Sequence, residues 1–467
     1  MDATFLQNRV PVDEGPICML NIDTLLVIFN FLSLYEKLIA MRVSKEWHLI
    51  IKNHDWTVID FRDRGPTRKV AESRRLFRRF VSQNGPNIFE YREYGKEWQF
   101  PMNENDVFKF LTLYAGTGLQ EIYLSVASEE IIGYLCVNCP NIKTLGLHFE
   151  IMCDRKVPNF EFVPKHDYGN LCQLLLYSLP KLHRLDLTWP ANWKSSFIEW
   201  NCYEQIIQLL QKCNLRYISL HKVDLNFFMT MLKKMSPVTL THLREVELHF
   251  TVSERETADE LLSSTVGWMT SLTCFKLTGK LDGDKFLPSI THLTHLKILT
   301  LQRVRYSTEA FEMMIQRLPN LETLVLEGIS VTSSVVNLIS IHLKKIKSLE
   351  LSPRTWSKYS SESLQSLSYH PTLENLAVQQ AYDEKNQTNW VERIFDILVT
   401  LPKIKNVTLK GYNLVSCFSQ ALYPIIECAE IEVILFKKVD GPCRCWIISF
   451  TKPVTSEVLK LENILKY

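Results

Sequence analysis

The sequence predicts a curved α/β solenoid, in which short parallel strands line the concave side and helices cover the outer side. The first observation is a short phrase, apolar-x-x-apolar-x-apolar, which occurs twelve times between residues 119 and 436. The second is its spacing, because the clearest copies, which begin at Leu296, Leu321 and Ile346, follow one another at intervals of 25 residues. The third is length: 467 residues exceed one ordinary compact core, whereas a stack of repeats grows in one dimension. One repeat cannot bury its own apolar face, so neighbouring repeats must stack.

Each phrase is expected to form one short strand of a parallel sheet, with its three apolar residues pointing into the core. The twelve phrases begin at Leu119, Ile142, Leu182, Leu215, Leu243, Leu272, Leu296, Leu321, Ile346, Leu373, Ile404 and Ile431. Apolar residues at helical spacing lie between the phrases, as in the run from Phe311 to Leu318. Five phrases have a proline two places before them, which ends the preceding helix. The order within a repeat is therefore strand, turn, helix and stop.

Composition and charge narrow the possible functions. The net charge of +2 gives the molecule no strong attraction to nucleic acid or to a membrane surface. No stretch approaches the roughly eighteen consecutive apolar residues that a membrane-spanning helix needs. The first residues lack the basic region and apolar run of a secretory signal. We therefore expect a cytoplasmic or nuclear protein with no membrane and no nucleic-acid partner.

The twelve cysteines indicate reduced thiols in such a chain. Cys136 and Cys139 form a C-x-x-C pair, and Cys443 and Cys445 form a C-x-C pair. Neither pair has a convincing second pair at the spacing of a zinc site. We interpret these cysteines as small buried apolar residues, and predict no metal site and no cofactor.

The first sixty residues do not repeat, and they predict three short helices. An apolar stripe at helical spacing runs from Ile22 to Leu32. A second helix is expected from Tyr35 to Met41, and a third begins near Ser44 and carries Trp47. Three such helices make a very small core, so the module is expected to lean on a partner or on the neighbouring repeats.

Several positions of this module match a known family. They are the run Leu20-Asn-Ile-Asp-Thr-Leu25, the residues Ile28, Phe29, Leu32 and Leu38, and the run Val43-Ser-Lys-Glu-Trp47. This pattern resembles an F-box. The stretch from Trp56 to Phe61 is similar to the segment where F-box proteins with leucine-rich repeats enter their first repeat. The family usually has Leu-Pro where this chain has Leu20-Asn21, and a proline there would fix the chain direction before the first helix.

The resemblance implies the substrate-recognition subunit of a Skp–cullin–F-box ubiquitin ligase. In that arrangement the F-box binds a Skp-family adaptor, the adaptor joins a cullin and a RING subunit, and the repeats hold a protein substrate. Catalysis belongs to the partner enzymes, so we expect no enzyme activity and no catalytic residue in this chain. The expected adaptor-binding residues are Leu20, Ile22, Leu25, Ile28, Phe29, Leu32, Leu38, Val43 and Trp47. Some of them must also serve the core of the module itself.

The predicted organisation has three parts. They are an F-box over residues 17–61, a basic linker with irregular first repeats over residues 62–118, and a leucine-rich-repeat solenoid with a C-terminal cap over residues 119–467. A different interpretation of the first part also remains open, because three helices could serve only to cover the open end of the solenoid.

The side chains between and just after the apolar positions of each phrase are expected to face the concave surface. Their charges are mixed, and the absence of clustered Lys and Arg argues against nucleic acid and against a phosphorylated substrate. We therefore expect the substrate to be an unmodified protein surface. The candidate substrate-binding residues are Tyr217, His221, Glu245, Glu247, His249, Lys276, Glu327 and Glu350. His221 and His249 fall in adjacent strands, and we interpret them as a solvated pair rather than a metal or pH-sensing site.

Two further segments leave alternatives open. Residues 62–80 are strongly basic, and they fit either a solvated helix face or a patch for nuclear import or an acidic partner. Residues 188–206 carry three tryptophans, and they fit either anchor residues for a protein partner or a loop folded back to bury them.

The sequence also lacks the motifs of common catalytic and nucleotide-binding sites, such as a P-loop, a zinc-protease H-E-x-x-H helix or a G-x-S-x-G nucleophile elbow. Two alternatives to a ligase receptor remain. One is a leucine-rich-repeat scaffold that assembles proteins and recruits no ligase. The other is a small-molecule sensor, which would need a deep pocket with a basic floor that the concave side chains do not suggest.

Overall fold

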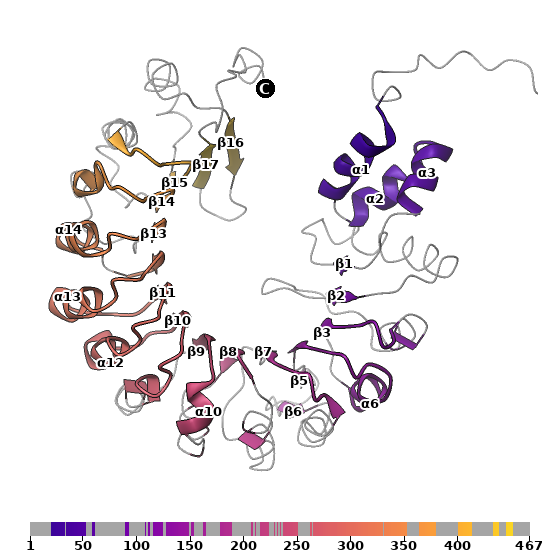
Figure 1. Ribbon diagram of the computed structural model, residues 1–467, viewed down its shortest axis with the longest axis horizontal. Coiled ribbons are helices and arrows are strands. Elements are labelled where there is room, and N and C mark those ends of the chain that lie inside the picture. Colours follow the sequence, from indigo (N-terminus) through magenta and orange to yellow (C-terminus); the bar gives the residue numbers. More distant parts are fainter. Residues whose placement is uncertain are drawn as a thin grey trace, which may run out of the picture. The chain divides into compact units, whose positions relative to one another are not determined.

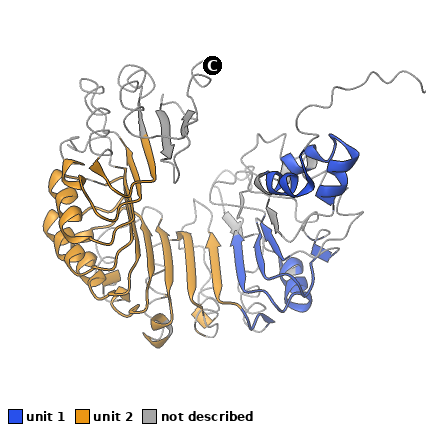
Figure 2. Cartoon of the chain, turned by 45° about the horizontal axis from the view of Figure 1, so that its top comes forward, with its two compact units in different colours: residues 1–150, 177–181 blue, residues 151–176, 182–467 orange. Residues whose placement is uncertain are grey.

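The computed structural model divides into two compact units, residues 1–150 with 177–181 (unit 1) and residues 151–176 with 182–467 (unit 2) (Figure 2). The structure describes residues 20–32, 34–52, 58–60, 89–92, 108, 111–112, 115–124, 128–148, 151–153, 162–164, 178–188, 207–208, 211, 215–223, 228, 231, 234, 237–250, 262–263, 265–329, 331–352, 364–379, 400–412, 433–438 and 445–451. The basic stretch 62–80 and nearly all of the tryptophan-rich segment 188–206 lie outside the described residues, so the alternatives for both stay open.

Unit 1 begins with three short helices, α1 (Ile22–Phe31), α2 (Leu34–Ala40) and α3 (Lys45–Lys52) (Figure 1). They are the three helices that the sequence predicts, and both α1 and α2 contact α3. Leu25, Phe29 and Ile51 are buried, and the ring of Phe29 meets that of Trp47 edge-on with centroids 5.1 Å apart. The core of this module is therefore a handful of apolar side chains, as its length requires.

Asn21, which stands where F-box proteins usually have proline, is the N-cap of α1. Its side-chain oxygen accepts a hydrogen bond of 2.8 Å from the backbone N–H of Thr24. The first N–H groups of a helix have no partner within the helix, so this bond satisfies one of them. Ser44 does the same for α3, where its hydroxyl accepts a bond of 3.0 Å from Trp47 N–H. The departure from the family pattern thus keeps a defined start for α1.

We expect Asn21→Ala to destabilise α1 by about 1 kcal/mol, because the Thr24 N–H loses its acceptor. Hydrogen exchange of the backbone amides of α1 would measure the change as faster exchange. Asn21→Ser is the matched control, because serine caps a helix about as well as asparagine and should leave the exchange rates almost unchanged. Equal protection in the alanine and serine variants would contradict a capping role for Asn21.

Four strands of unit 1 pair in parallel in chain order: β1 (Val58–Asp60), β2 (Glu90–Arg92), β3 (Glu121–Leu124) and β4 (Thr144–His148). α6 (Glu129–Asn138) connects β3 to β4, and it ends two residues before Pro140, as predicted. Tyr123 and Gly146 are register partners, and a Cβ at Gly146 would overlap the ring of Tyr123. This glycine therefore gives the tyrosine room to lie across the neighbouring strand.

Unit 2 is a curved α/β solenoid in which each phrase from Leu182 to Ile404 contributes one strand. Residues at the same position of successive phrases lie side by side in neighbouring strands. The parallel strands are β7 (Arg184–Thr188), β8 (Tyr217–Val223), β9 (Glu245–Phe250), β10 (Cys274–Thr278), β11 (Ile298–Gln302), β12 (Thr323–Glu327), β13 (Ser348–Ser352), β14 (Asn375–Gln379) and β15 (Asn406–Tyr412). Equivalent positions pair from strand to strand, as in Phe275 with Leu299 and Leu299 with Leu324. These apolar positions are buried, so the prediction that they point into the core is confirmed.

Helices cover the outer side of unit 2, away from the strands (Figure 1). They are α10 (Pro237–Thr241), α12 (Gly283–Ile290), α13 (Thr308–Gln316) and α14 (Ser333–His342), followed by the short 3₁₀ helix η3 (Gln365–Leu367). The predicted apolar run in α13 buries Phe311, Met314 and Ile315. A separate antiparallel pair, β5 (Ile151–Cys153) with β6 (Phe162–Pro164), precedes the first strand of this sheet.

The twelfth phrase, which begins at Ile431, does not form the parallel strand that its pattern predicts. Its strand β16 (Val433–Lys438) pairs in antiparallel fashion with β17 (Cys445–Thr451), and β17 pairs in antiparallel fashion with β15. β16 therefore runs in the same direction as β15, but β17 lies between them in the sheet, and the prediction is wrong because the alternation of apolar residues does not show which strand will be the neighbour. The antiparallel pair instead occupies the sheet edge that β15 would otherwise expose.

Candidate protein-interaction surfaces

The nine expected adaptor-binding residues differ in their exposure to solvent on the three-helix module of unit 1. Leu25 and Phe29 are 3% and 1% exposed, so they form the core of the module. Ile22, Ile28 and Val43 are 56%, 40% and 64% exposed. Leu20, Leu32 and Trp47 are partly exposed, and the side chain of Leu38 lies outside the described residues. The assignment of all nine to adaptor binding stays a prediction, and Ile22, Ile28 and Val43 are the ones open to a partner without rearrangement of the helices.

Further apolar side chains of the same module are exposed. They are Val27 in α1, Ile39 in α2 and Leu49 in α3. Burial of an aliphatic side chain stabilises a protein by roughly 1.5–3 kcal/mol relative to its exposure to water. The module forgoes this stabilisation at each of these exposed positions. Exposed apolar groups gathered on one small module are typical of a protein-binding surface.

On the concave side of unit 2, six of the eight candidate substrate-binding residues lie on three neighbouring strands. Tyr217 and His221 are on β8, Glu245, Glu247 and His249 on β9, and Lys276 on β10. The strand register aligns them in the columns that the sequence predicts, with Tyr217 beside Glu245 and His221 beside His249. Glu327 and Glu350 lie on β12 and β13, two and three strands beyond β10, so they do not belong to this group.

Two residues outside the predicted set, Arg184 and Asp186 on β7, extend this group. The guanidinium of Arg184 lies 3.7 Å from the ring centroid of Tyr217, a cation–π contact. Asp186 Oδ1 lies 3.8 Å from His221 Nε2. Both residues occupy the same columns as the predicted residues, so their positions in the phrase were the signal that could have found them.

Glu247 is the nearly buried centre of the group, only 9% exposed. Its Oε2 accepts a hydrogen bond of 3.5 Å from the Tyr217 hydroxyl and lies 3.6 Å from Lys276 Nζ. Burial raises the pKa of Tyr217, so its hydroxyl stays protonated and available as a donor. A buried carboxylate needs such partners, because transfer of an unpaired charge out of water is costly.

The two histidines lie as the sequence predicts, with ring centroids 6.3 Å apart. His221 is buried, and its Nε2 shares a hydrogen bond of 2.6 Å with the Ser219 hydroxyl. His221 is therefore a hydrogen-bonded member of the group and not the solvated residue that the sequence interpretation expected. Within the part of the chain that the structure describes, no three His, Cys, Asp or Glu side chains come together as a metal site would require.

We call these residues, Arg184, Asp186, Tyr217, Ser219, His221, Glu245, Glu247, His249 and Lys276, the β7–β10 polar group. It presents charges of both signs and the ring of Tyr217 on a surface held by parallel strands, while Ser219 and His221 within the group are buried. Tyr and Arg are the residues that most often dominate the affinity of protein interfaces. The group is therefore suited to binding a protein surface of mixed charge.

The C-x-x-C pair has the environment of structural cysteines. Cys139 is buried at the end of α6, and burial raises the pKa of its thiol to about 11, with a further contribution from nearby Cys136. The thiolate is the reactive form, so this cysteine is poorly suited to redox chemistry or metal binding. The interpretation of Cys139 as a small buried apolar residue is confirmed.

Comparison with known families identifies the two parts of the chain. The model of the F-box domain matches residues 17–58, and the model described as FBD-associated F-box protein At5g56370, LRR repeats, matches residues 235–394. The chain is an F-box protein with leucine-rich repeats. Domains of these two kinds are typically non-catalytic adaptor or scaffold modules. No curated protein sequence matches this F-box protein.

Three solved structures resemble the F-box protein at 14% sequence identity each. One is Rad7 in complex with Elc1 from yeast, with a TM-score of 0.41 over 64% of this chain and 77% of that chain. Another is an internalin (InlF) of Listeria monocytogenes, with a TM-score of 0.31 over 64% and 77%. The third is the leucine-rich-repeat protein LegL7 of Legionella pneumophila, with a TM-score of 0.39 over 69% and 99%.

Proposed function

We propose that this F-box protein is the substrate-recognition subunit of a Skp–cullin–F-box ubiquitin ligase. The F-box binds a Skp-family adaptor, the adaptor brings the cullin and RING subunits, and the repeats bind a protein substrate. The observation that carries the proposal is the exposure of Ile22, Ile28 and Val43 in the module that matches the F-box model. These residues match the family pattern, yet the helices do not use them for their own core.

The repeats position the substrate and take no part in the chemical step of ubiquitin transfer. A receptor that holds a substrate beside a charged ubiquitin carrier raises the effective concentration of the substrate lysines, and this alone accelerates transfer. The β7–β10 polar group is the surface of unit 2 that we assign to the substrate.

The described helices include none that is long and apolar enough to cross a bilayer. We place the protein in the cytoplasm, the nucleus or both.

Reconstitution with purified subunits tests the proposal. The full chain would be mixed with a cullin, with or without a Skp-family adaptor, and passed through a size-exclusion column. We expect the chain to elute with the cullin only when the adaptor is present, because in this arrangement the adaptor joins the F-box to the cullin. A chain that elutes alone in both mixtures would refute the ligase assignment and favour the scaffold alternative.

A further inference from the structure

A row of side chains at the starts of the strands of unit 2 forms a second polar surface, at the rim of the sheet. Each residue of the row directly precedes a strand: Arg216 precedes β8, Arg244 β9, Thr273 β10 and Lys297 β11. Their backbones are bonded in sequence, since Arg244 N–H donates to Arg216 O (2.8 Å), Thr273 N–H to Arg244 O (2.7 Å) and Lys297 N–H to Thr273 O (2.8 Å). Adjacent members of the row are therefore about one strand spacing apart, roughly 5 Å.

Farther along the same rim, opposite charges alternate and pair. Glu322, which precedes β12, lies 3.1 Å from Lys297 Nζ and 2.6 Å from Lys347 Nζ, and Glu374 lies 2.8 Å from Lys405 Nζ. Hydrogen bonds from Lys347 and Lys297 lower the pKa of Glu322, so this carboxylate stays charged over a wider pH range. From β12 to β15 the charges of the rim therefore cancel, and Lys297 before β11 also contacts Glu322.

The beginning of the row differs, because two arginines follow each other without an acid between them. Among the described residues, no carboxylate pairs with the guanidinium of Arg216 or with that of Arg244. Like charges at adjacent positions of neighbouring strands repel each other. An anion bound between the two guanidinium groups would be attracted to both of them and would offset their mutual repulsion.

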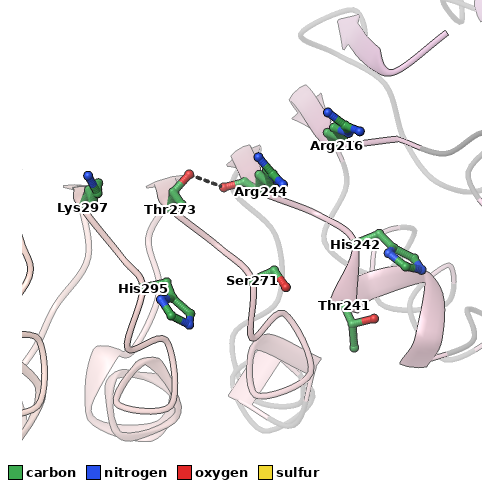
Figure 3. A pocket seen from close by; sticks show the side chains of 8 residues that line it. All are labelled: Arg216, Thr241, His242, Arg244, Ser271, Thr273, His295 and Lys297. Atoms are coloured by element: carbon green, nitrogen blue, oxygen red, sulfur yellow. Dashed lines mark hydrogen bonds between the residues drawn. The ribbon is translucent and has the colours of Figure 1, made fainter. Parts of the chain in front are cut away.

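A hollow of about 410 Å³ lies along this part of the rim (Figure 3). Arg216, Arg244, Thr273 and Lys297 form one row of its lining, and His242, Ser271 and His295 lie in a second row on the loops before the strands. Thr241 completes the lining, which contains no carboxylate. The Thr273 hydroxyl donates to the Arg244 carbonyl oxygen at 3.1 Å, which links two neighbours of the first row.

This lining is suited to a phosphoryl group. A guanidinium presents parallel N–H donors whose spacing matches two oxygens of a phosphate, and lysine adds a point charge. Hydroxyl and imidazole groups supply further donors for the remaining oxygen. The basic run is short, because it covers only four strand starts, about 15 Å, before Glu322 reverses the sign. That length accommodates one phosphorylated side chain of an extended segment and is too short for a polyanion.

We propose that the rim hollow, lined by Arg216, Arg244 and Lys297, binds a phosphorylated serine or threonine of a protein substrate. The proposal deepens the proposed function and rests on it, because the phosphorylated segment would belong to the protein that the repeats hold. The sequence interpretation expected an unmodified substrate, since it considered only the concave columns. The rim residues occupy the first spacer of each phrase, which lies outside those columns.

The test uses the full chain in complex with a Skp-family adaptor. The probes are three immobilised peptide libraries of random sequence that differ at one fixed central position, which is phosphoserine, glutamate or unphosphorylated serine. We expect the phosphoserine library to retain at least tenfold more protein than either of the others. Equal retention by the glutamate library would overturn the assignment to a phosphoryl group, and equal retention by the serine library would overturn the anion site.

Paired variants locate the site. We expect Arg216→Gln with Arg244→Gln to reduce retention by the phosphoserine library at least tenfold. The matched control is Lys403→Gln with Lys405→Gln, which removes the same charge from exposed positions in the same part of another repeat, and it should change retention less than twofold. Equal losses in both double variants would show a general charge effect and overturn the site. A short single-stranded RNA that displaces the protein from the phosphoserine library as well as a phosphopeptide does would also overturn it.

Adaptor affinity, measured on the same samples, separates this inference from the proposed function. The arginine variants should bind the adaptor as tightly as the unchanged chain does, because they lie in unit 2. Failure of the proposed function would instead be seen as absence of adaptor binding by the unchanged chain, whatever the libraries retain.

Discussion

Replacement of Ile28 and Val43 by aspartate is expected to weaken binding of the Skp-family adaptor at least a hundredfold, while the helices of the F-box stay folded. Both side chains are exposed, so aspartate meets water and not the core in the free protein. In the complex each loses a buried apolar contact worth roughly 1.5–3 kcal/mol. About 1.4 kcal/mol corresponds to a tenfold change in affinity, so two such losses exceed a hundredfold. Calorimetric titration of the full chain with purified adaptor would measure the change.

The chain offers a control with the same residue types and the same substitutions. Val238 in α10 and Ile341 in α14 are also exposed, but they lie on the outer helices of the repeats. Val238→Asp with Ile341→Asp should bind the adaptor with unchanged affinity. If the Ile28 and Val43 variant also keeps its affinity, the exposed residues of α1 and of the turn after α2 are not the adaptor surface.

Phe29→Ala is expected to unfold the three-helix module. The side chain is fully buried and its ring packs edge-on against Trp47, and truncation of a buried phenylalanine typically costs 3–5 kcal/mol. A module with so small a core has little stability to lose. Hydrogen exchange should therefore show loss of protection over residues 20–52, together with loss of adaptor binding. The repeats should keep their protection, because the stability of a repeat depends mainly on its neighbours.

The same substitution in the repeats is the matched comparison. Phe311 in α13 is fully buried and stacks on Tyr306 with centroids 5.1 Å apart. Phe311→Ala should lower protection around α13 and leave adaptor affinity unchanged. Retained protection over residues 20–52 in the Phe29 variant would show that the F-box core does not depend on this ring.

The sequence determines the strands of unit 2 well because each phrase encodes both their faces and their register. The columns of Tyr217 with Glu245 and of His221 with His249 follow directly from phrase alignment, and the structure confirms them. The phrase does not encode which strand will be the neighbour, so the strand of the Ile431 phrase pairs with β17 in antiparallel fashion and not with β15. The two earliest strands, β1 and β2, precede the twelve phrases, so the phrase pattern does not predict β2 as a strand.

Which F-box residues form the core and which stay exposed could not be predicted, because a helical stripe of apolar residues is broader than the face that three short helices bury. Leu25 and Ile28 are one turn apart on that stripe, yet the first is buried and the second is exposed. The sequence does not predict the rim hollow, and the reason is different. Its arginines and lysine belong to different repeats, and only backbone pairing between the strands brings them into one row.

The central claim is that one polypeptide carries two separable surfaces, one for the adaptor and one for the substrate. Quantitative mass spectrometry of proteins purified with the full chain, from cells in which the proteasome is inhibited, tests it most directly. Ile28→Asp with Val43→Asp should lose the adaptor and cullin and retain substrates. Tyr217→Ala with Lys276→Ala, in the β7–β10 polar group, should lose substrates and retain the adaptor and cullin. Loss of the same set of proteins in both variants, or of none in either, would contradict the claim.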